Sequence, residues 1–166
     1  MNTAIIWDRS DGTTSRESIA KVEKKLGVSF PDEYITIVMN YNGSCPTPCL
    51  YKIYGKETGN AYKKIFGYLI PYGLQDRPNF LEEYTVLKKM LPKNVIPFAD
   101  DPGGDYICFD FRSSDEPKIV YADMEVAVHV DNCTRKERLS GEVEKMQEEA
   151  LYDVADSFAE FIDNLF

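Results

Sequence analysis

Four short apolar runs follow one another closely between residues 95 and 130, and they constrain the fold more than any other feature of the sequence. The runs are Val95–Ala99, Tyr106–Phe111, Lys118–Tyr121 and Val126–Val130. Clusters of Gly, Pro, Asp and Ser separate them, and short apolar runs bounded in this way are typical of β-strands. Because short connections join antiparallel neighbours, the spacing predicts an antiparallel meander.

Helical periodicity flanks these strands on both sides. A capping box at Thr14 and Glu17 precedes Ile19, Val22 and Leu26, and Gly27 ends that first helix. A second helix is predicted from Pro31 with Tyr34, Val38 and Tyr41 buried; a third carries Phe80, Tyr84, Leu87 and Leu91; a last carries Leu151, Val154, Phe158, Phe161 and Leu165. Apolar residues at intervals of three and four form one buried helix face. Helices at both ends of a run of strands predict an α+β fold.

Two segments lack a clear pattern. Residues 44–79 are rich in Tyr, Gly and Pro, with short strands predicted near Leu50–Tyr54 and Ile65–Ile70. Residues 131–150 are polar and charged, which predicts a loop or an exposed helix. At 166 residues the chain has the common size of one domain, so we expect a single domain over residues 1–166.

Charge is unevenly distributed along the chain, whose net charge is −9. Residues 1–97 hold 13 basic and 10 acidic side chains, whereas residues 98–166 hold 6 basic and 18 acidic ones, so the two balances are +3 and −12. An acidic surface repels nucleic-acid phosphates and attracts basic proteins. The sequence therefore favours a basic protein partner over nucleic acid, although acidic residues also serve solubility alone.

The sequence predicts a cytoplasmic protein without a membrane segment. No stretch approaches the roughly 20 apolar residues of a membrane-spanning helix. Met1–Arg9 lacks the basic start and apolar core of a secretory leader. The four cysteines are fewer than a disulfide framework in a small secreted protein would need.

No nucleophile has a suitable histidine partner. His129 is the only histidine, and in the run Val126–Val130 it shares the face of Ala127, opposite the valines. We interpret that face as solvated. A serine or cysteine triad needs a histidine positioned beside the nucleophile, so the residues predict no such hydrolase.

The cysteines do not have the spacing of a metal site. Cys45 and Cys49 flank Pro-Thr-Pro, but Cys108 and Cys133 do not make the second close pair that a structural zinc site requires. The sequence also lacks a phosphate-binding glycine loop and a Gly-x-Gly-x-x-Gly motif. We therefore predict no metal and no cofactor.

An acidic cluster surrounds a glycine turn between two of the predicted strands. Its members are Asp100, Asp101, Asp105 and Asp110, around Gly103 and Gly104. Carboxylates so arranged can bind Ca²⁺ or act as a paired acid and base. The spacing does not fit an EF-hand, which needs a glutamate at loop position twelve. We favour a structural interpretation, in which the glycines form the turn and the aspartates accept its N–H groups.

Several short motifs, in the same order along the chain, resemble those of the SUKH superfamily, named partly for yeast cell-wall regulators of the Smi/Knr type. The matching segments are Val22-Glu23 with Leu26-Gly27, Phe30 to Tyr34, Tyr41 to Ser44, Ile96 to Asp100, Gly103 to Asp110, Ile119 to Tyr121, and Ser157 to Leu165. Ser44 stands where the family commonly has a second glycine. Residues 44–80 and 131–150 match no motif, so we expect them to carry individual specificity.

The resemblance implies an α+β fold with a mixed sheet flanked by helices. It also implies a bacterial immunity protein that neutralises a toxin, often a nuclease or a nucleic-acid deaminase, without catalysis. The expected binding residues are Asp100, Asp101, Asp105, Asp115, Glu116, Asp123 and Glu125, with Tyr51, Tyr54 and Tyr72 as aromatic anchors unless these tyrosines pack in the core. The alternatives are a regulatory scaffold like the yeast members, using residues 131–150 for recognition, and a metal-dependent enzyme using the Asp100–Asp110 cluster. The oligomeric state stays open.

Overall fold

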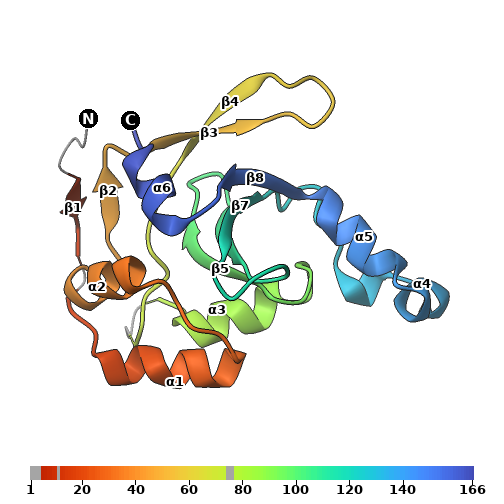
Figure 1. Cartoon of the computed structure of the whole chain (residues 1–166). Helices are drawn as coiled ribbons and strands as arrows, with labels where there is room; N and C mark the ends of the chain where they lie inside the picture. Colours follow the sequence, from red (N-terminus) through yellow and green to blue (C-terminus); the bar gives the residue numbers. More distant parts are fainter. Residues whose placement is uncertain (1–4, 11, 74–76) are drawn as a thin grey trace.

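A four-stranded antiparallel sheet forms the centre of the computed structural model, which describes residues 5–10, 12–73 and 77–166 (Figure 1). Its strands are β5 (Val95–Asp100), β6 (Tyr106–Asp110), β7 (Lys118–Ala122) and β8 (Leu151–Ala155), in the spatial order β5-β6-β7-β8. The first three strands are the predicted meander. Residues 1–4, which belong to the Met1–Arg9 stretch compared with a secretory leader, lie outside the described part, as do residues 11 and 74–76.

The prediction of a fourth strand at Val126–Val130 is wrong. The N–H group of Asp123, directly after β7, donates to the carbonyl of Ala150, directly before β8, over 2.9 Å. The N–H group of Ala127 then donates back to the carbonyl of Asp123 over 3.1 Å, which turns the chain away from the sheet. The chain continues into a short 3₁₀ helix, η1 (Val130–Asn132). The alternating valines fit a strand, but β8 occupies the edge of β7 that they would need.

One face of the central sheet packs against helices from both ends of the chain. These helices are α1 (Arg16–Leu26), α2 (Asp32–Asn40) and α6 (Phe158–Asp163). The core between them includes Ile19, Val22, Tyr34, Val38, Phe98, Ile107, Phe109, Ile119, Phe158 and Phe161. The rings of Phe98 and Phe109 stack with centroids 4.3 Å apart, and Tyr34 meets Phe109 edge-on at 5.0 Å. This aromatic cluster fixes the helices on the sheet.

The opposite face has a smaller core beneath helix α3 (Phe80–Leu87). Leu87 and Leu91 pack there against Val95, Cys108, Val120 and Leu151. Leu91 lies beyond the end of α3, although the sequence pattern included it in the helix. Helices together with antiparallel strands confirm the predicted α+β class.

Three details of the predicted helices are corrected. The side chain of Ser15, not that of Thr14, caps α1 by accepting the N–H group of Ser18. Tyr41 is 41% exposed and stacks on Trp7 instead of lying in the core. The predicted last helix is divided: Leu151–Ala155 is strand β8, and α6 begins at Phe158 after its cap Ser157.

Two small antiparallel sheets complete the strands. Strand β1 (Ile6–Asp8) pairs with β2 (Cys45–Thr47). Strand β3 (Leu50–Tyr54), as predicted, pairs with β4 (Ala61–Ile65), and this hairpin extends away from the body in Figure 1. The strand predicted at Ile65–Ile70 is instead an irregular segment that bonds to the outer edge of β5, with one isolated bridge from Leu69 to Ala99.

Residues 131–150 adopt the helical alternative of the prediction. Helices α4 (Arg135–Ser140) and α5 (Glu142–Glu149) extend to one side of the sheet (Figure 1). The side-chain amide of Gln147 attaches them to the body by donating to the carbonyls of Lys89 and Val128, both over 3.1 Å. Within the described residues, the helices are too short or too polar to cross a membrane.

Candidate partner-binding surface

Asp101 and Asp105, at the two ends of the turn between β5 and β6, both accept hydrogen bonds from other residues of the chain. Asp101 accepts the N–H groups of Gly103 at 2.7 Å and Ile65 at 3.2 Å. Asp105 accepts the hydroxyl of Tyr121 and, at 2.9 Å, the N–H group of Met124. The ammonium of Lys64 lies 3.7 Å from the Asp105 carboxylate. Asp101 therefore accepts an N–H group of the glycine turn as predicted, whereas Asp105 binds β7 and the chain directly after it.

Asp100 is also used inside the molecule. Its carboxylate accepts the N–H group of Tyr68 at 2.6 Å and lies 3.8 Å from the guanidinium of Arg77. Burial is the largest influence on this side chain and raises the pKa of Asp100 above its ordinary value. Such a carboxylate fastens the segment after β4 to the edge of β5.

Asp123 and Glu125 lie near each other after β7. Asp123 accepts the N–H group of Glu125 at 3.0 Å, as in an Asx turn, and lines a cavity of about 820 Å³ with Lys56, Lys64 and Tyr152. Glu125 is exposed. This pair borders lysines, so its charge is partly offset locally.

Asp115 and Glu116 line an open groove of about 480 Å³. The groove lies between the start of α2, the loop before β7 and the start of α6. Its walls carry four carboxylates, those of Asp32, Glu33, Asp115 and Glu116. The buried residues Phe30, Pro117 and Phe158 line it as well. We call this feature the acidic groove.

The four carboxylates of the acidic groove have no hydrogen bond and no ion pair with any residue in the described part of the chain. The fold explains how two distant segments meet here. Pro31 starts α2, whose first turn favours acidic residues such as Asp32 and Glu33. Phe30 and Phe158 pack in the same core and bring the loop containing Asp115 beside them. The groove therefore presents unneutralised negative charge above an apolar floor.

Sequence reasoning identified only half of this groove. Asp32 and Glu33 are typical of the first turn of a helix, but nothing in the sequence pairs them with residues 115 and 116. The neighbourhood depends on the packing of α2 against α6, which are far apart along the chain. The acidic first turn after Pro31 was the available signal.

The three predicted tyrosines have different environments. Tyr72 is buried, stacks on Phe80 and shares a hydrogen bond with the hydroxyl of Tyr34 at 3.2 Å. Tyr51 is 2% exposed, and its buried hydroxyl has no hydrogen-bond partner among the described residues. Burial raises the pKa of both phenols. Only Tyr54, at 58% exposed, is accessible to a partner; the other two fit the predicted alternative of core packing.

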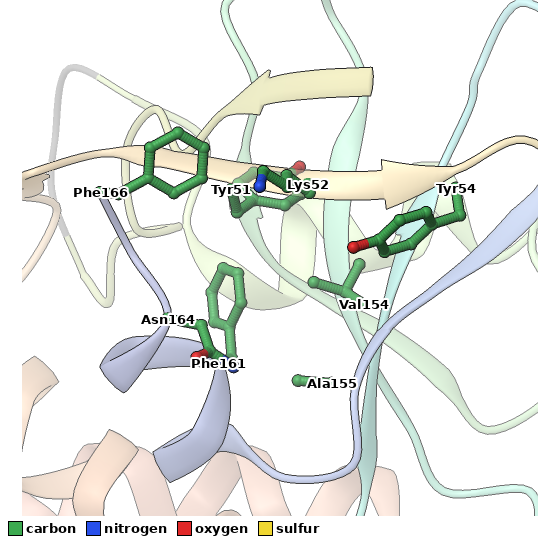
Figure 2. A pocket seen from close by; sticks show the side chains of 8 residues that line it. All are labelled: Tyr51, Lys52, Tyr54, Val154, Ala155, Phe161, Asn164 and Phe166. Carbon is green, nitrogen blue, oxygen red and sulfur yellow. The ribbon is translucent and has the colours of Figure 1, made fainter. Parts of the chain in front are cut away.

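A second cavity of about 290 Å³ lies beside β3 (Figure 2). Phe166 and Tyr54 stand at its opposite ends, with Phe161 and Val154 between them. The ring of Tyr51 contacts that of Phe161 edge-on, with centroids 5.4 Å apart. Aromatic and aliphatic side chains line it together with Lys52 and Asn164, which supply polar groups.

His129 and the cysteines are placed away from these surfaces. The imidazole Nδ1 of His129 accepts the N–H group of Asp131 at 3.2 Å, so it caps η1 instead of lying on a strand. All four cysteines are free thiols. Across residues 5–10, 12–73 and 77–166, His, Cys, Asp and Glu side chains form no group of three or more that could hold a metal ion.

Comparison with known proteins bears on these features. The sequence model of the SMI1/KNR4 family (SUKH-1) matches residues 13–164, which include the acidic groove, the β3–β4 hairpin and the α4–α5 segment. No curated protein matches the chain. Since the match covers nearly the whole sequence, the chain belongs to the SMI1/KNR4 family (SUKH-1).

Proposed function

We propose that this chain is an immunity protein that binds and neutralises a toxin in the cytoplasm, without catalysis of its own. Family membership and the acidic character of residues 98–166 support this proposal. The observation that carries it is the acidic groove, where four carboxylates without partners among the described residues surround an apolar floor. A basic cleft that normally binds nucleic-acid phosphates has the complementary charge.

The other predicted acidic residues have secondary roles in this proposal. Asp100, Asp101 and Asp105 use their carboxylates to bind other parts of the chain, so they contribute long-range charge but few direct contacts. Glu125 is exposed and remains a candidate contact. We therefore centre the proposed interface on Asp115 and Glu116, together with Asp32 and Glu33.

The expected binding free energy depends on how fully the groove carboxylates are buried against basic side chains of the toxin. Truncating one member of a desolvated, hydrogen-bonded charge pair at an interface costs on the order of 2–5 kcal/mol, which corresponds to roughly 30-fold or more in Kd. Raised salt slows the association of oppositely charged partners because it screens their long-range attraction. Both effects distinguish a charge-based interface from an apolar one.

The test uses the toxin domains encoded in reading frames beside this gene. Each domain is expressed with the chain, and survival of the cells and Kd for the purified pair are measured. We expect the double variant Asp115→Asn with Glu116→Gln to weaken binding at least tenfold. The control, Glu142→Gln with Glu144→Gln, removes the same charge from the exposed start of α5 and should bind nearly as the unmodified chain does.

Two outcomes would contradict the proposal. One is the absence of protection against every neighbouring toxin domain. The other is an association that is insensitive to ionic strength and to the groove variants. Binding to cell-wall-synthesis or signalling proteins instead would support the regulatory scaffold, with α4 and its exposed Leu139 as the first region to examine.

A further inference from the structure

The β3–β4 hairpin has an open edge. In an antiparallel pair, successive residues alternate between facing the partner strand and facing away from it. The N–H group of Gly55 donates to the carbonyl of Asn60, and that of Phe66 donates to the carbonyl of Cys49. By the same alternation, the backbone groups of Tyr62 and Lys64 also face β3. Ala61, Lys63 and Ile65 therefore direct their backbone N–H and C=O groups outward, away from the hairpin.

Two of these three residues have unpaired backbone groups. The N–H group of Ile65 donates to the carboxylate of Asp101 at 3.2 Å, which closes that end of the edge. The outward groups of Ala61 and Lys63 have no hydrogen bond within the described residues. Unpaired groups at a sheet edge are a template for an added strand.

The side chains beside this edge set its charge. Lys64 contacts Asp105 and Tyr121, and Lys56 donates to the carbonyls of Glu148 and Glu149 at the end of α5, so both are used internally. Lys52 and Lys63 form a cross-strand pair over the ring of Phe166, at 5.3 and 5.7 Å. Neither has an acidic partner in the part of the chain that the structure describes.

On the other face of the hairpin, an exposed aromatic ring lies beside this edge. Tyr62, next to Lys63, is 49% exposed and lines the large cavity beside Tyr152. A strand added to β4 would place one residue across from Lys63 and the next across from Tyr62, on the other face. An acidic residue fits the first position and an apolar residue the second.

We propose that β4 binds an extended, acidic segment of a partner protein, which pairs with Ala61 and Lys63 as an added strand. A second copy of this chain fits the edge less well. Pairing through β4 in any register would bring two lysine-rich hairpins together, and like charges across or diagonal to each other destabilise a sheet. This surface is separate from the acidic groove, and its occupant has the opposite charge.

The test is an NMR titration with a blocked peptide of sequence Thr-Glu-Val-Glu-Val-Glu-Thr. We expect binding to slow hydrogen exchange at the amides of Ala61 and Lys63, while those of Tyr62 and Lys64, already bonded to β3, change little. The matched peptide with Lys in place of each Glu should not produce this alternation. Lys63→Pro removes the outward N–H group without breaking the β3–β4 ladder, so it should abolish the effect.

A variant that reverses the charge of residue 63 keeps the test valid if the proline variant perturbs the hairpin. Lys63→Glu should weaken binding of the Glu peptide by about two- to fivefold, the range for a cross-strand ion pair, and improve binding of the Lys peptide. Lys93→Glu, an equal charge change at an exposed site away from the hairpin, should leave both unchanged.

Three results would overturn the inference: no change at Ala61 and Lys63 at millimolar peptide, equal binding of both peptides, or a dimer formed through β4 in sedimentation experiments. Variants of the acidic groove should bind the peptide normally. Failure here is thus distinguishable from failure of the proposed function.

Discussion

Gly67 allows the chain after β4 to approach the edge of β5. Its N–H group donates to the carbonyl of Asp100 at 2.9 Å. A Cβ atom at this position would collide with the Asp100 carboxylate and lie 2.9 Å from its carbonyl oxygen. Backbone cannot move aside as the tip of a side chain can, so this position requires glycine for close approach.

We expect Gly67→Ala to lower the free energy of unfolding by about 1–3 kcal/mol, as forced overpacking does. Gly103→Ala is the matched control. A Cβ there meets no backbone atom, only carboxylate oxygens, the nearer being that of Asp101 at 3.0 Å. The control should cost clearly less than Gly67→Ala because a side chain yields more readily than backbone and alanine restricts the unfolded chain. Urea denaturation of both variants measures the difference, and equal losses would contradict the role of Gly67.

At the scale of single residues, the sequence identified roles better than partners. The turn function of Asp101 followed from the adjacent glycines. The contacts of Asp105 with Lys64 and Tyr121 could not be predicted, because they depend on how the hairpin crosses the sheet. The special status of Gly67 was equally hidden, since it belongs to no motif.

Helices α4 and α5 are attached to the body by one buried amide and by polar contacts of Lys56 and Arg112 with the end of α5. Gln147 is 6% exposed and donates to the carbonyls of Lys89 and Val128. The carbonyl of Lys89 also accepts the N–H group of Val130 at 2.8 Å, so this loop and α5 meet at one point. Apart from Val143, Gln147 and Cys133, the described residues from 131 to 149 are at least partly exposed, so apolar burial contributes little there.

Gln147→Ala should therefore destabilise the α4–α5 segment locally. The variant loses both hydrogen bonds to these carbonyls, each worth about 0.5–1.5 kcal/mol. We expect faster hydrogen exchange in residues 131–149 with little change in the central strands. Lys145→Gln, at an exposed position of the same helix, is the control and should change neither. Uniform loss of protection throughout the sheet would show that the segment is not an independent unit.

At the scale of elements, sequence periodicity predicted strands correctly where each strand pairs with the next one along the chain. It predicted β5, β6 and β7 because turns of a few residues determine their pairing. It failed at Leu151–Ala155, whose apolar spacing continues that of α6 although the chain is a strand. Here pairing with β7 overrides local preference, and the same pairing excludes Val126–Val130 from the sheet. Nothing in either segment reveals which of them reaches β7.

At the scale of the whole molecule, the acidic character of residues 98–166 is not one continuous surface. Part of it is used internally: Asp110 pairs with Arg112 at 2.8 Å, and hydrogen bonds and charge from that guanidinium offset burial and hold the pKa of Asp110 below its ordinary value. The acidic groove differs because its carboxylates lack partners in the part of the chain that the structure describes, and because two of its four come from the N-terminal half. The charge balance of the sequence therefore predicted the sign of the surface but not its location.

Unpartnered carboxylates that line one groove repel each other, so the groove should reduce the stability of the free chain. We expect Asp115→Asn with Glu116→Gln to raise Tm by about 1–2 °C at low salt, since like-charge pairs on a surface cost a few tenths of a kcal/mol. The control, Glu142→Gln with Glu144→Gln, removes the same charge from the first turn of α5, where the helix dipole favours acidic residues, and should lower Tm.

The two double variants thus have the same net charge but opposite expected effects. At 0.5 M NaCl both shifts should shrink, because screening reduces interactions among exposed charges. Equal shifts of the same sign would mean that total charge, not the groove, determines stability. Opposite shifts, together with weaker toxin binding by the more stable variant alone, would show that the chain sacrifices stability to keep these carboxylates available for a partner.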